Sequence, residues 1–480
     1  YTIMTDETRE ISNREQSVIC IRWVDDYNVR EDPIGLNEIP SQDAQTITNV
    51  LKDALTRCGT PLANCRGQAY DGGSNVSGKL NGVATKLKKE VPNAIYVHCL
   101  SHCLNFAVQG ICKTQKTGST ENPNLIHEAL AFMHEVAKLI RLSPKKHCIL
   151  QEIKQNISTG EMPTRSNLQP LFPARWTIRA NAINAVLQCY RDGILYATLQ
   201  EICQDSSDSA ATVLGLMYQM DAFDTYFSLK LAYLKFSASD HLATRLQSKN
   251  TITQDAILGV STLCDYYSSR RQEECLDTFY HSVLEESKDI TEETKLPSTG
   301  HIFYSLKKYY RQQYFEILEL VHEKVDSHCG SEKYGIVQDI ETLLLEACNG
   351  KSKQYDLDIE QLKIQLKMLP NFITAAKVIK KITTKRTLCD IFSENQMAQS
   401  IFIDVQKLLL LYLTIPATTA TAEHTFSMLR CLKTYLRSTM NQDRLNNLLL
   451  LHVHKDLANK RKLQILLPQQ INIKEQKQHD

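Results

Sequence analysis

The hydrophobic pattern of this chain changes once, and that change constrains the fold more than any other feature. In residues 1–105, short runs of branched and aromatic residues alternate with two amphipathic helical segments. After residue 105, almost every readable segment repeats its apolar residues at helical spacing. We therefore expect an α/β layer followed by a large all-helical block.

The first part of the chain predicts five strands and two helices. Strands are expected near 1–5, 16–24, 33–39, 67–71 and 94–99, and helices at 43–58 and around 83–91. This order of three strands, helix, strand, helix and strand matches RNase H-like mixed sheets, although periodicity alone leaves other α/β arrangements open.

The remainder of the chain predicts helices and a polar tail. Helical segments are expected at 126–142, 176–202, 210–236, 261–286 and 304–326, and again from 401 to about 467. Residues 468–480 are rich in Gln and Lys, which is typical of disorder. We divide the chain into 1–105, a helical insertion at 106–400, a C-terminal segment at 401–467 and the tail at 468–480.

The composition excludes few classes of function. The 480 residues carry 55 Lys and Arg against 54 Asp and Glu, a formal net charge of +1, so nucleic-acid binding would depend on local basic patches. Solvated helix faces explain the two available clusters equally well. These clusters are Lys377, Lys380, Lys381, Lys385 and Arg386, and Arg430, Lys433 and Arg437.

Cysteine use and hydropathy indicate an intracellular chain without a membrane segment. Fifteen cysteines are scattered without a regular framework and no secretory signal precedes them, which favours reduced thiols. The apolar run at 405–416 is too short to span a bilayer. Because the chain opens at Tyr1 directly in a strand-like run, we also expect that residues upstream are missing.

Three acidic residues are candidates for metal-dependent chemistry. Asp6 ends the first apolar strand and Asp71 ends the fourth, so both carboxylates project from one sheet edge if the two strands are neighbours. Two-metal phosphoryl transfer needs oxygen ligands that hold two Mg²⁺ ions about 3.5–4 Å apart. The alternative is that a strand-end Asp starts a turn or caps a helix. Glu423 opens a helix after Pro416, where a Glu commonly only complements the helix dipole.

Two further pairs have both a functional and a structural interpretation. Cys99 and His102 form a C-x-x-H pair, which is half of a zinc site. No second pair follows at finger-like spacing, so we expect no structural zinc, and instead a buried thiol and imidazole with local hydrogen bonds. Arg175 could grip a phosphate and Trp176 could stack on an unpaired base, but a core Trp beside a solvated Arg explains them as well.

Five segments, taken in order, resemble hAT-superfamily transposases, in particular the branch with a DUF4371 domain and similarity to MYM-type zinc-finger proteins. They extend over most of the chain. The segments are Thr5-Asp-Glu-Thr-Arg-Glu-Ile-Ser-Asn-Arg-Glu-Gln, Tyr70-Asp-Gly-Gly-Ser-Asn-Val-Ser-Gly, His98-Cys-Leu-Ser-His-Cys-Leu-Asn, Ala174-Arg-Trp, and Ala422-Glu-His-Thr-Phe-Ser with Leu432-Lys-Thr-Tyr-Leu-Arg-Ser-Thr-Met.

The resemblance implies a fold, a reaction and site residues. It implies an RNase H-like core interrupted by the helical insertion and completed by a dimerisation region at 401–467. It also implies a catalytic, metal-binding triad of Asp6, Asp71 and Glu423 that uses Mg²⁺ or Mn²⁺, and DNA contacts by Arg175 and Trp176 near the transposon end. Activated water would cleave DNA at the element's ends, and a freed 3′-hydroxyl would attack target DNA. The zinc-finger module that commonly precedes this core is not in the sequence.

Three functional hypotheses remain from the sequence. The first is a Mg²⁺-dependent transposase core that binds transposon ends in the nucleus and self-associates as a dimer or higher oligomer. The second is a domesticated, non-catalytic nuclear dimer that regulates transcription or acts as a scaffold. A stand-alone RNase H-like nuclease is the third, but it would leave the helical block and the C-terminal segment without a purpose.

Overall fold

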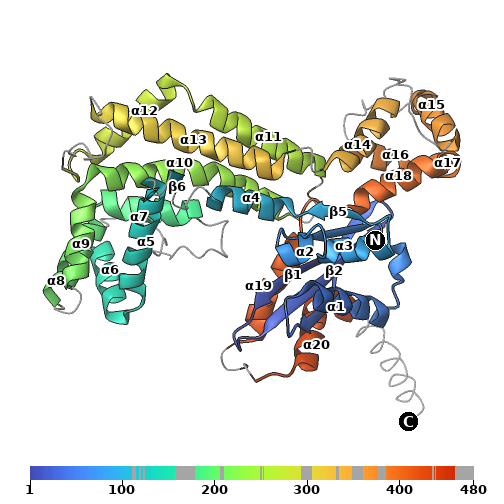
Figure 1. Ribbon diagram of the computed structural model, residues 1–480, viewed down its shortest axis with the longest axis horizontal. Coiled ribbons are helices and arrows are strands. Elements are labelled where there is room, and N and C mark those ends of the chain that lie inside the picture. The colour runs from blue at the N-terminus through green and yellow to red at the C-terminus, as the bar shows by residue number, and fades with distance from the viewer. Residues whose placement is uncertain are drawn as a thin grey trace, which may run out of the picture. The chain divides into compact units, whose positions relative to one another are not determined.

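The described chain forms two compact units in the computed structural model (Figure 1). Unit 1 comprises Tyr1–His102, Leu246–Ala256 and Ser331–Asp480, and unit 2 comprises Cys103–Arg245 and Ile257–Gly330. Within these limits the structure describes residues 1–110, 115–117, 120–122, 125–157, 179–205, 210–248, 251, 253–292, 305–330, 334–348, 360–375, 385–434, 437 and 439–459. The expected combination of a mixed sheet with a mostly helical remainder is confirmed.

Unit 1 is built on a five-stranded mixed sheet. Strands β1 (Thr2–Arg9), β2 (Glu15–Asp25) and β3 (Asn28–Glu38) form an antiparallel meander. Strands β4 (Gly67–Tyr70) and β5 (Ile95–His98) add in parallel, which gives the order β3-β2-β1-β4-β5. The two residues between β2 and β3, Asp26 and Tyr27, both have positive φ, as a tight type I′ hairpin turn requires.

Both faces of this sheet are covered. Ile19 packs into a core with Ile47 and Leu51 of helix α1 (Ala44–Arg57), which begins at Asp43, whose side chain accepts hydrogen bonds from the first-turn amides. The neighbouring strand residues Val18 and Cys20 are also fully buried. Since adjacent strand residues point to opposite faces, a second layer must cover the other side.

The second layer consists of the last three described helices, α18 (Ile403–Thr414), α19 (Ala420–Leu432) and α20 (Gln442–Val453). They pack against β1, β2 and β3, and Figure 1 shows the red end of the chain beside the blue strands. Arg22 of β2 donates through Nε to the carbonyl of Leu413 at 3.0 Å and pairs with Glu31 at 2.6 Å, and both charged side chains are buried. The C-terminal segment therefore completes the α/β core.

Unit 1 also contains shorter helices around the sheet and a helical extension. The short helices are η1 (Leu62–Asn64), α2 (Ser74–Ser77) and α3 (Val83–Glu90). The extension consists of α14 (Gly335–Cys348), α15 (Glu360–Ala375), α16 (Lys385–Glu394) and α17 (Gln396–Ile401). Residues 331–400, which we assigned to the helical insertion from the sequence, are grouped with the sheet in this division.

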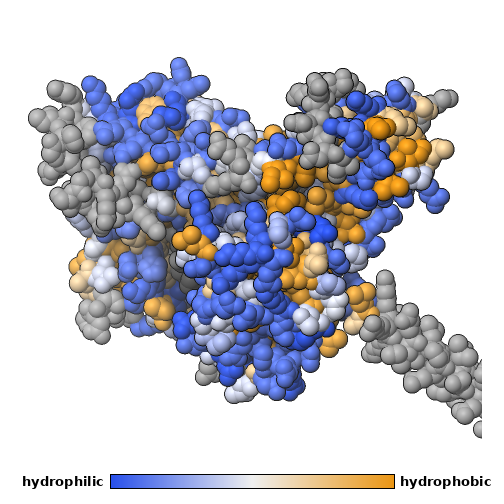
Figure 2. All heavy atoms as spheres, turned by 45° about the vertical axis from the view of Figure 1, so that its right-hand side comes forward, coloured by the Kyte–Doolittle hydropathy of each residue, from blue (hydrophilic) through white to orange (hydrophobic). Residues whose placement is uncertain are grey.

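Hydrophobic side chains gather on the outer surface of this extension (Figure 2). Ile364 and Met368 are one helical turn apart on α15, and Met397 and Ile401 are spaced in the same way on α17. With Ile403 at the start of α18, all five side chains are between 39% and 64% exposed. An exposed apolar group of this kind is typical of a surface that associates with another protein chain.

Where its residues are described, unit 2 is helical apart from a short hairpin of β6 (Gln115–Thr117) and β7 (Thr120–Asn122). Its helices are α5 (Leu125–Arg141), α6 (Pro144–Ile157), α7 (Arg179–Arg191), α8 (Ile194–Asp205), α9 (Ala210–Asp221), α11 (Thr253–Ser269), α12 (Glu273–Ser287) and α13 (Leu306–Cys329). Helices α4 (Leu100–Gly110) and α10 (Phe223–Leu246) also lie mostly in this unit. Aromatic rings form part of its core, including Phe227 and Tyr310, whose ring centroids are 4.5 Å apart.

The structure corrects three of the expected element limits. The strand expected at 1–5 continues to Arg9 because β2 pairs with it along its whole length. The helix expected at 176–202 is interrupted at Gly193, whose φ of 70° is incompatible with a right-handed helix. The helix expected at 210–236 is divided between α9 and α10 at Ala222. Among the described helices, none combines the length and apolarity needed to cross a membrane.

Candidate active site

Asp6 and Asp71 lie at the same level on neighbouring parallel strands. The pairing of β1 with β4 matches Met4 with Ala69, and each aspartate lies two residues further along its strand. Asp71 directly follows β4, as expected. Asp6, by contrast, lies inside β1 rather than at its end, because β1 continues along β2 after its pairing with β4 stops. The two carboxylates therefore share one edge of the β1–β4 pair.

Asp71 also has the local role of a turn residue. Its Oδ1 accepts a hydrogen bond from the amide of Gly73 at 3.1 Å, which is the pattern of an Asx turn. The turn passes close to the end of β5, since a Cβ atom at Gly72 would lie 2.4 Å from Nε2 of His98. Asp71 can form this turn and also bind a metal, because only its Oδ1 accepts the hydrogen bond from the amide of Gly73.

Glu423 reaches the same region from the C-terminal part of the chain. It lies in the first turn of α19, the helix that packs against β1, β2 and β3. Gln247 donates to its Oε2 at 3.2 Å, whereas its Oε1 is buried and finds no hydrogen-bond partner among the described residues. A role for Glu423 beside Asp6 requires this packing of α19 against the early strands.

The C-x-x-H pair lies beside Glu423. Nδ1 of His102, in the first turn of α4, is 3.7 Å from Oε1 of Glu423. The sulfur of Cys99 accepts a hydrogen bond from the amide of Thr419 at 3.2 Å. One ligand atom from each of Cys99, His102 and Glu423 lies within 4.8 Å of the other two. The pair therefore faces the proposed triad.

The electrostatics of the site reflect crowded, buried carboxylates. Burial raises the pKa of Asp6 to about 7, and Glu423 and Asp71 raise it further while His102 opposes them. Burial likewise raises the pKa of Glu7 to about 7, with added repulsion from Asp71, Glu15 and Asp6. Such repulsion is what a divalent cation would relieve.

His102 and Glu423 influence each other. Burial by itself would lower the pKa of His102, but its contacts with Cys99, Asp6 and Glu423 raise it well above the ordinary value. Burial raises the pKa of Glu423, and His102 opposes that shift. The imidazole and the two carboxylates of Asp6 and Glu423 therefore favour each other's charged forms.

The acidic edge opens into a cavity of about 270 Å³. It is lined by Thr5, Asp6, Glu7, Glu15, Gln42, Asp71, Asn75 and Val76. The sequence analysis missed Glu7 and Glu15, whose neighbourhood depends on the pairing of Arg9 with Glu15 across the first hairpin. It also missed Gln247, because no spacing in the sequence connects that residue with Glu423.

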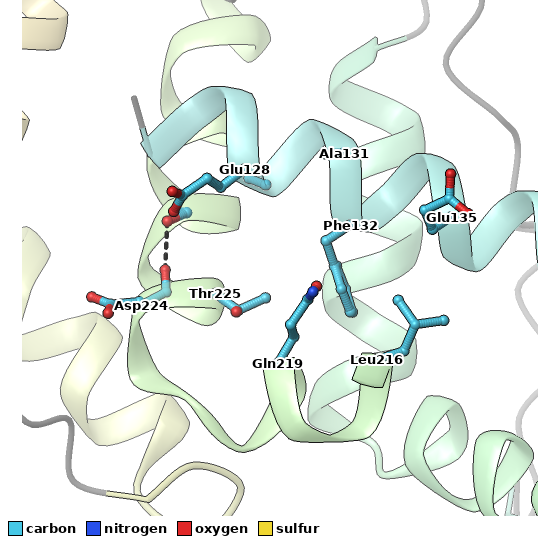
Figure 3. Close-up of a pocket in the computed structure, with 10 residues that line it drawn as sticks. Glu128, Ala131, Phe132, Glu135, Leu216, Gln219, Asp224 and Thr225 are labelled. Carbon is cyan, nitrogen blue, oxygen red and sulfur yellow. Dashed lines mark hydrogen bonds between the residues drawn. The ribbon is translucent and has the colours of Figure 1, made fainter. Parts of the chain in front are cut away.

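A larger cavity of about 380 Å³ lies in unit 2 and is lined by acidic side chains. Glu128 and Glu135 of α5 and Asp224 of α10 line it together with Phe132 and Leu216, as Figure 3 shows. Carboxylates would repel a phosphate backbone, so this cavity is not a candidate for binding nucleic acid.

The remaining predicted DNA contacts have mixed outcomes. Arg175 and Trp176 lie outside the described residues, as do Lys377, Lys380 and Lys381, so their roles stay predictions. Lys433, which we placed on a cationic helix face, is instead buried and donates to Glu10 at 2.8 Å. Arg430 is exposed on the same helix. The proposed basic surface on α19 is therefore weaker than expected.

Comparison with known families supports the resemblance at both ends of the chain. Residues 1–82 match the family described as ZMYM1/FAM200, RNase-like domain, which is the DUF4371 domain. Residues 374–457 match the hAT family C-terminal dimerisation region. Asp6 and Asp71 lie within the first matched segment, and Glu423 lies within the second.

Curated relatives match nearly the whole chain. It is 22% identical over 506 residues to the "52 kDa repressor of the inhibitor of the protein kinase" of Mus musculus, covering 95% of this chain. The Homo sapiens protein of the same name is 21% identical over 505 residues, with the same coverage. The chain spans 62% of the length of each of these relatives.

Proposed function

We propose that this protein is a hAT-type transposase core that cleaves and joins DNA strands with two divalent cations held by Asp6, Asp71 and Glu423. The observation that carries the proposal is the approach of Glu423 to the β1–β4 edge, from a helix more than 300 residues away in the chain. The electrostatic influence of both Glu423 and Asp71 on Asp6 supports this assignment.

The donor set fits Mg²⁺ or Mn²⁺. Both cations prefer carboxylate oxygens, and Oε1 of Glu423 is a buried oxygen that receives no hydrogen bond from the described residues. Burial and then the neighbouring carboxylates raise the pKa values of Asp6 and Glu7, and a bound cation would offset both effects. When bound, the cations would polarise the scissile phosphate and lower the pKa of the attacking water or hydroxyl.

The protein's own groups would position the reaction. The sheet fixes Asp6 and Asp71, while Gln247 orients Glu423 through its Oε2. His102, whose pKa is raised, would carry a proton beside Glu423 and could donate it to the leaving 3′-oxygen or stabilise charge on the phosphate. Arg175 and Trp176 would hold the transposon end through a phosphate contact and a stacked base.

Self-association through the dimerisation region forms part of this proposal. The exposed apolar residues on α15, α17 and the start of α18 lie within or next to the matched region 374–457. Burying such a group against a second copy would stabilise a dimer. A nuclear location is proposed on the same grounds, since transposon ends lie in chromosomal DNA.

The test is divalent-cation-dependent cleavage of DNA that carries the flanking terminal inverted repeats. The full-length protein should cut in Mg²⁺, and Asp71→Asn should reduce cutting by at least about a thousandfold while leaving DNA binding intact. Asp53→Asn, on an exposed face of α1, is the matched control and should cut as the wild type does. Equal cutting by wild type and Asp71→Asn would contradict the assigned mechanism.

The name of the two relatives, which describes a repressor, favours a second function. In this alternative the protein is a non-catalytic nuclear dimer that regulates transcription. This alternative predicts that the protein binds DNA or a protein partner and represses a reporter equally well with or without Asp71. Repression that survives Asp71→Asn, together with no cleavage by the wild type, would favour it over the transposase.

A further inference from the structure

We propose that Cys99, His102 and Glu423 form a binding site for a zinc ion, distinct in donor chemistry from the all-carboxylate set. A zinc ion bound there would occupy Glu423 and so withhold it from Mg²⁺. The binding site stands on its own geometry, whereas the inhibitory consequence rests on the proposed function.

The three ligand atoms come from parts of the chain that are held together by backbone hydrogen bonds. The amide of Cys99 donates to the carbonyl of Tyr70 at 2.9 Å, which connects the end of β5 with the end of β4. The amide of Leu100 donates to the carbonyl of Ala417 at 3.0 Å, just before α19. Because these backbone contacts fix the helix starts, the ligands are organised before any ion binds.

The three side chains bring one ligand atom each within 4.8 Å of the others. The amide of Thr419 donates to Sγ of Cys99 at 3.2 Å, and such a hydrogen bond favours the thiolate, which is the form that binds a metal. Nδ1 of His102 and Oε1 of Glu423 are buried and find no hydrogen-bond partner in the described part of the chain. At 3.7 Å these two atoms are too far apart for a hydrogen bond but suitably spaced for a shared ion.

The chemistry of the set selects zinc over magnesium. A thiolate and an imidazole are poor ligands for Mg²⁺ and good ligands for Zn²⁺, and three protein ligands leave one tetrahedral position open. A closed structural site would have four protein ligands, so this set describes an exchangeable ion. The sequence shows only the C-x-x-H half, because the third ligand comes from α19 near the other end of the chain.

Cobalt titration tests the site directly. Co²⁺ replaces Zn²⁺ in such sites, and a thiolate ligand gives it an intense near-ultraviolet absorption that added Zn²⁺ removes. The full chain, reduced and stripped of metal, should develop this absorption with one Co²⁺ per chain. Cys99→Ser should abolish it, and Cys431→Ser, which removes an exposed cysteine of α19, should not change it.

Glu423→Gln provides a second, independent readout. It should retain the thiolate absorption but weaken Co²⁺ binding by about tenfold or more, because one of three ligands is lost. This variant keeps the proposal testable if Cys99→Ser fails to fold, as judged by circular dichroism. A Co²⁺ spectrum without thiolate absorption, or one with unchanged affinity in Glu423→Gln, would overturn the site.

The inhibitory consequence has its own measurement. If the wild type cleaves DNA in Mg²⁺, Zn²⁺ should inhibit it, and Cys99→Ser should be at least about tenfold less sensitive to Zn²⁺ relative to its own zinc-free rate. Equal sensitivity of the two proteins would overturn the inhibition while leaving the Co²⁺ result to decide the site. A protein that binds Co²⁺ as described but never cleaves DNA would reject the proposed function and retain the zinc site.

Discussion

Asp6→Asn is expected to stabilise the metal-free protein while removing a proposed metal ligand. The pKa of Asp6 is raised from 3.8 to about 7, chiefly by burial and then by Glu423 and Asp71. A shift of about three units corresponds to about 4 kcal/mol at about 1.36 kcal/mol per unit. Since Glu7 and Glu423 readjust their protonation when one charge is removed, we expect about half of this, about 2 kcal/mol.

The sign of the effect depends on pH. A group whose pKa is raised by folding contributes stability below its unfolded pKa and loses that contribution as the pH rises through its folded pKa. Ionised Asp6 therefore destabilises the fold at pH 8 but is protonated and harmless near pH 4. The advantage of Asp6→Asn should be close to zero at pH 4, grow as the pH rises to 7, and reach its full size at pH 8.

Urea unfolding followed by far-ultraviolet circular dichroism measures this difference. With a chelator present, Asp6→Asn should have a clearly higher free energy of unfolding than the wild type at pH 8 and nearly the same free energy of unfolding at pH 4. Millimolar Mg²⁺ should then stabilise the wild type and leave the variant unchanged, because binding to the folded state raises its stability. A variant that is no more stable at pH 8, or equally stabilised at pH 4 and pH 8, would refute the electrostatic reasoning.

Three further predictions concern the packing that positions the site and the surface that joins two copies. Arg22→Met leaves Glu31 buried without its cation and should cost about 3 kcal/mol in urea unfolding; a loss below about 1 kcal/mol would show that Arg22 does not hold α18 to the sheet. Lys433→Met should lower the free energy of unfolding by a similar amount, because it leaves Glu10 buried without its cation. The double variant Lys433→Met/Glu10→Leu should regain most of the lost stability. A double variant as unstable as the single one would argue against a charge effect. Met397→Asp should convert a dimer into a monomer in light-scattering chromatography with unchanged circular dichroism, and a persistent dimer would exclude this surface.

The sequence predicted the sheet well because strand signals are local. Runs of branched and aromatic residues bounded by turn residues predict the five strands, and two consecutive glycines after Asp71 predict the turn there. The predicted ends of strands and helices were less accurate where contact with another segment sets them. Strand β1 extends to Arg9 only because β2 pairs with it, which no local pattern reports.

The candidate site could be predicted only in part. Its three carboxylates and the C-x-x-H pair were named from strand ends, a helix start and the family resemblance. Their mutual geometry depends on tertiary contacts. The approach of His102 to Glu423, the hydrogen bond from Gln247 and the acidic surroundings of Glu7 arise from packing between distant segments. The same distance in sequence concealed the burial of Lys433 against Glu10.

Anomalous diffraction from crystals soaked in Mn²⁺ would locate the cations themselves. Mn²⁺ occupies Mg²⁺ sites and scatters anomalously, so the carboxylate edge can be examined without any assumption about the DNA substrate. We expect two anomalous peaks about 3.5–4 Å apart, each within bonding distance of oxygens from Asp6, Asp71 or Glu423. Well-ordered crystals with no peak at this edge, or with Glu423 turned away from every bound ion, would contradict it.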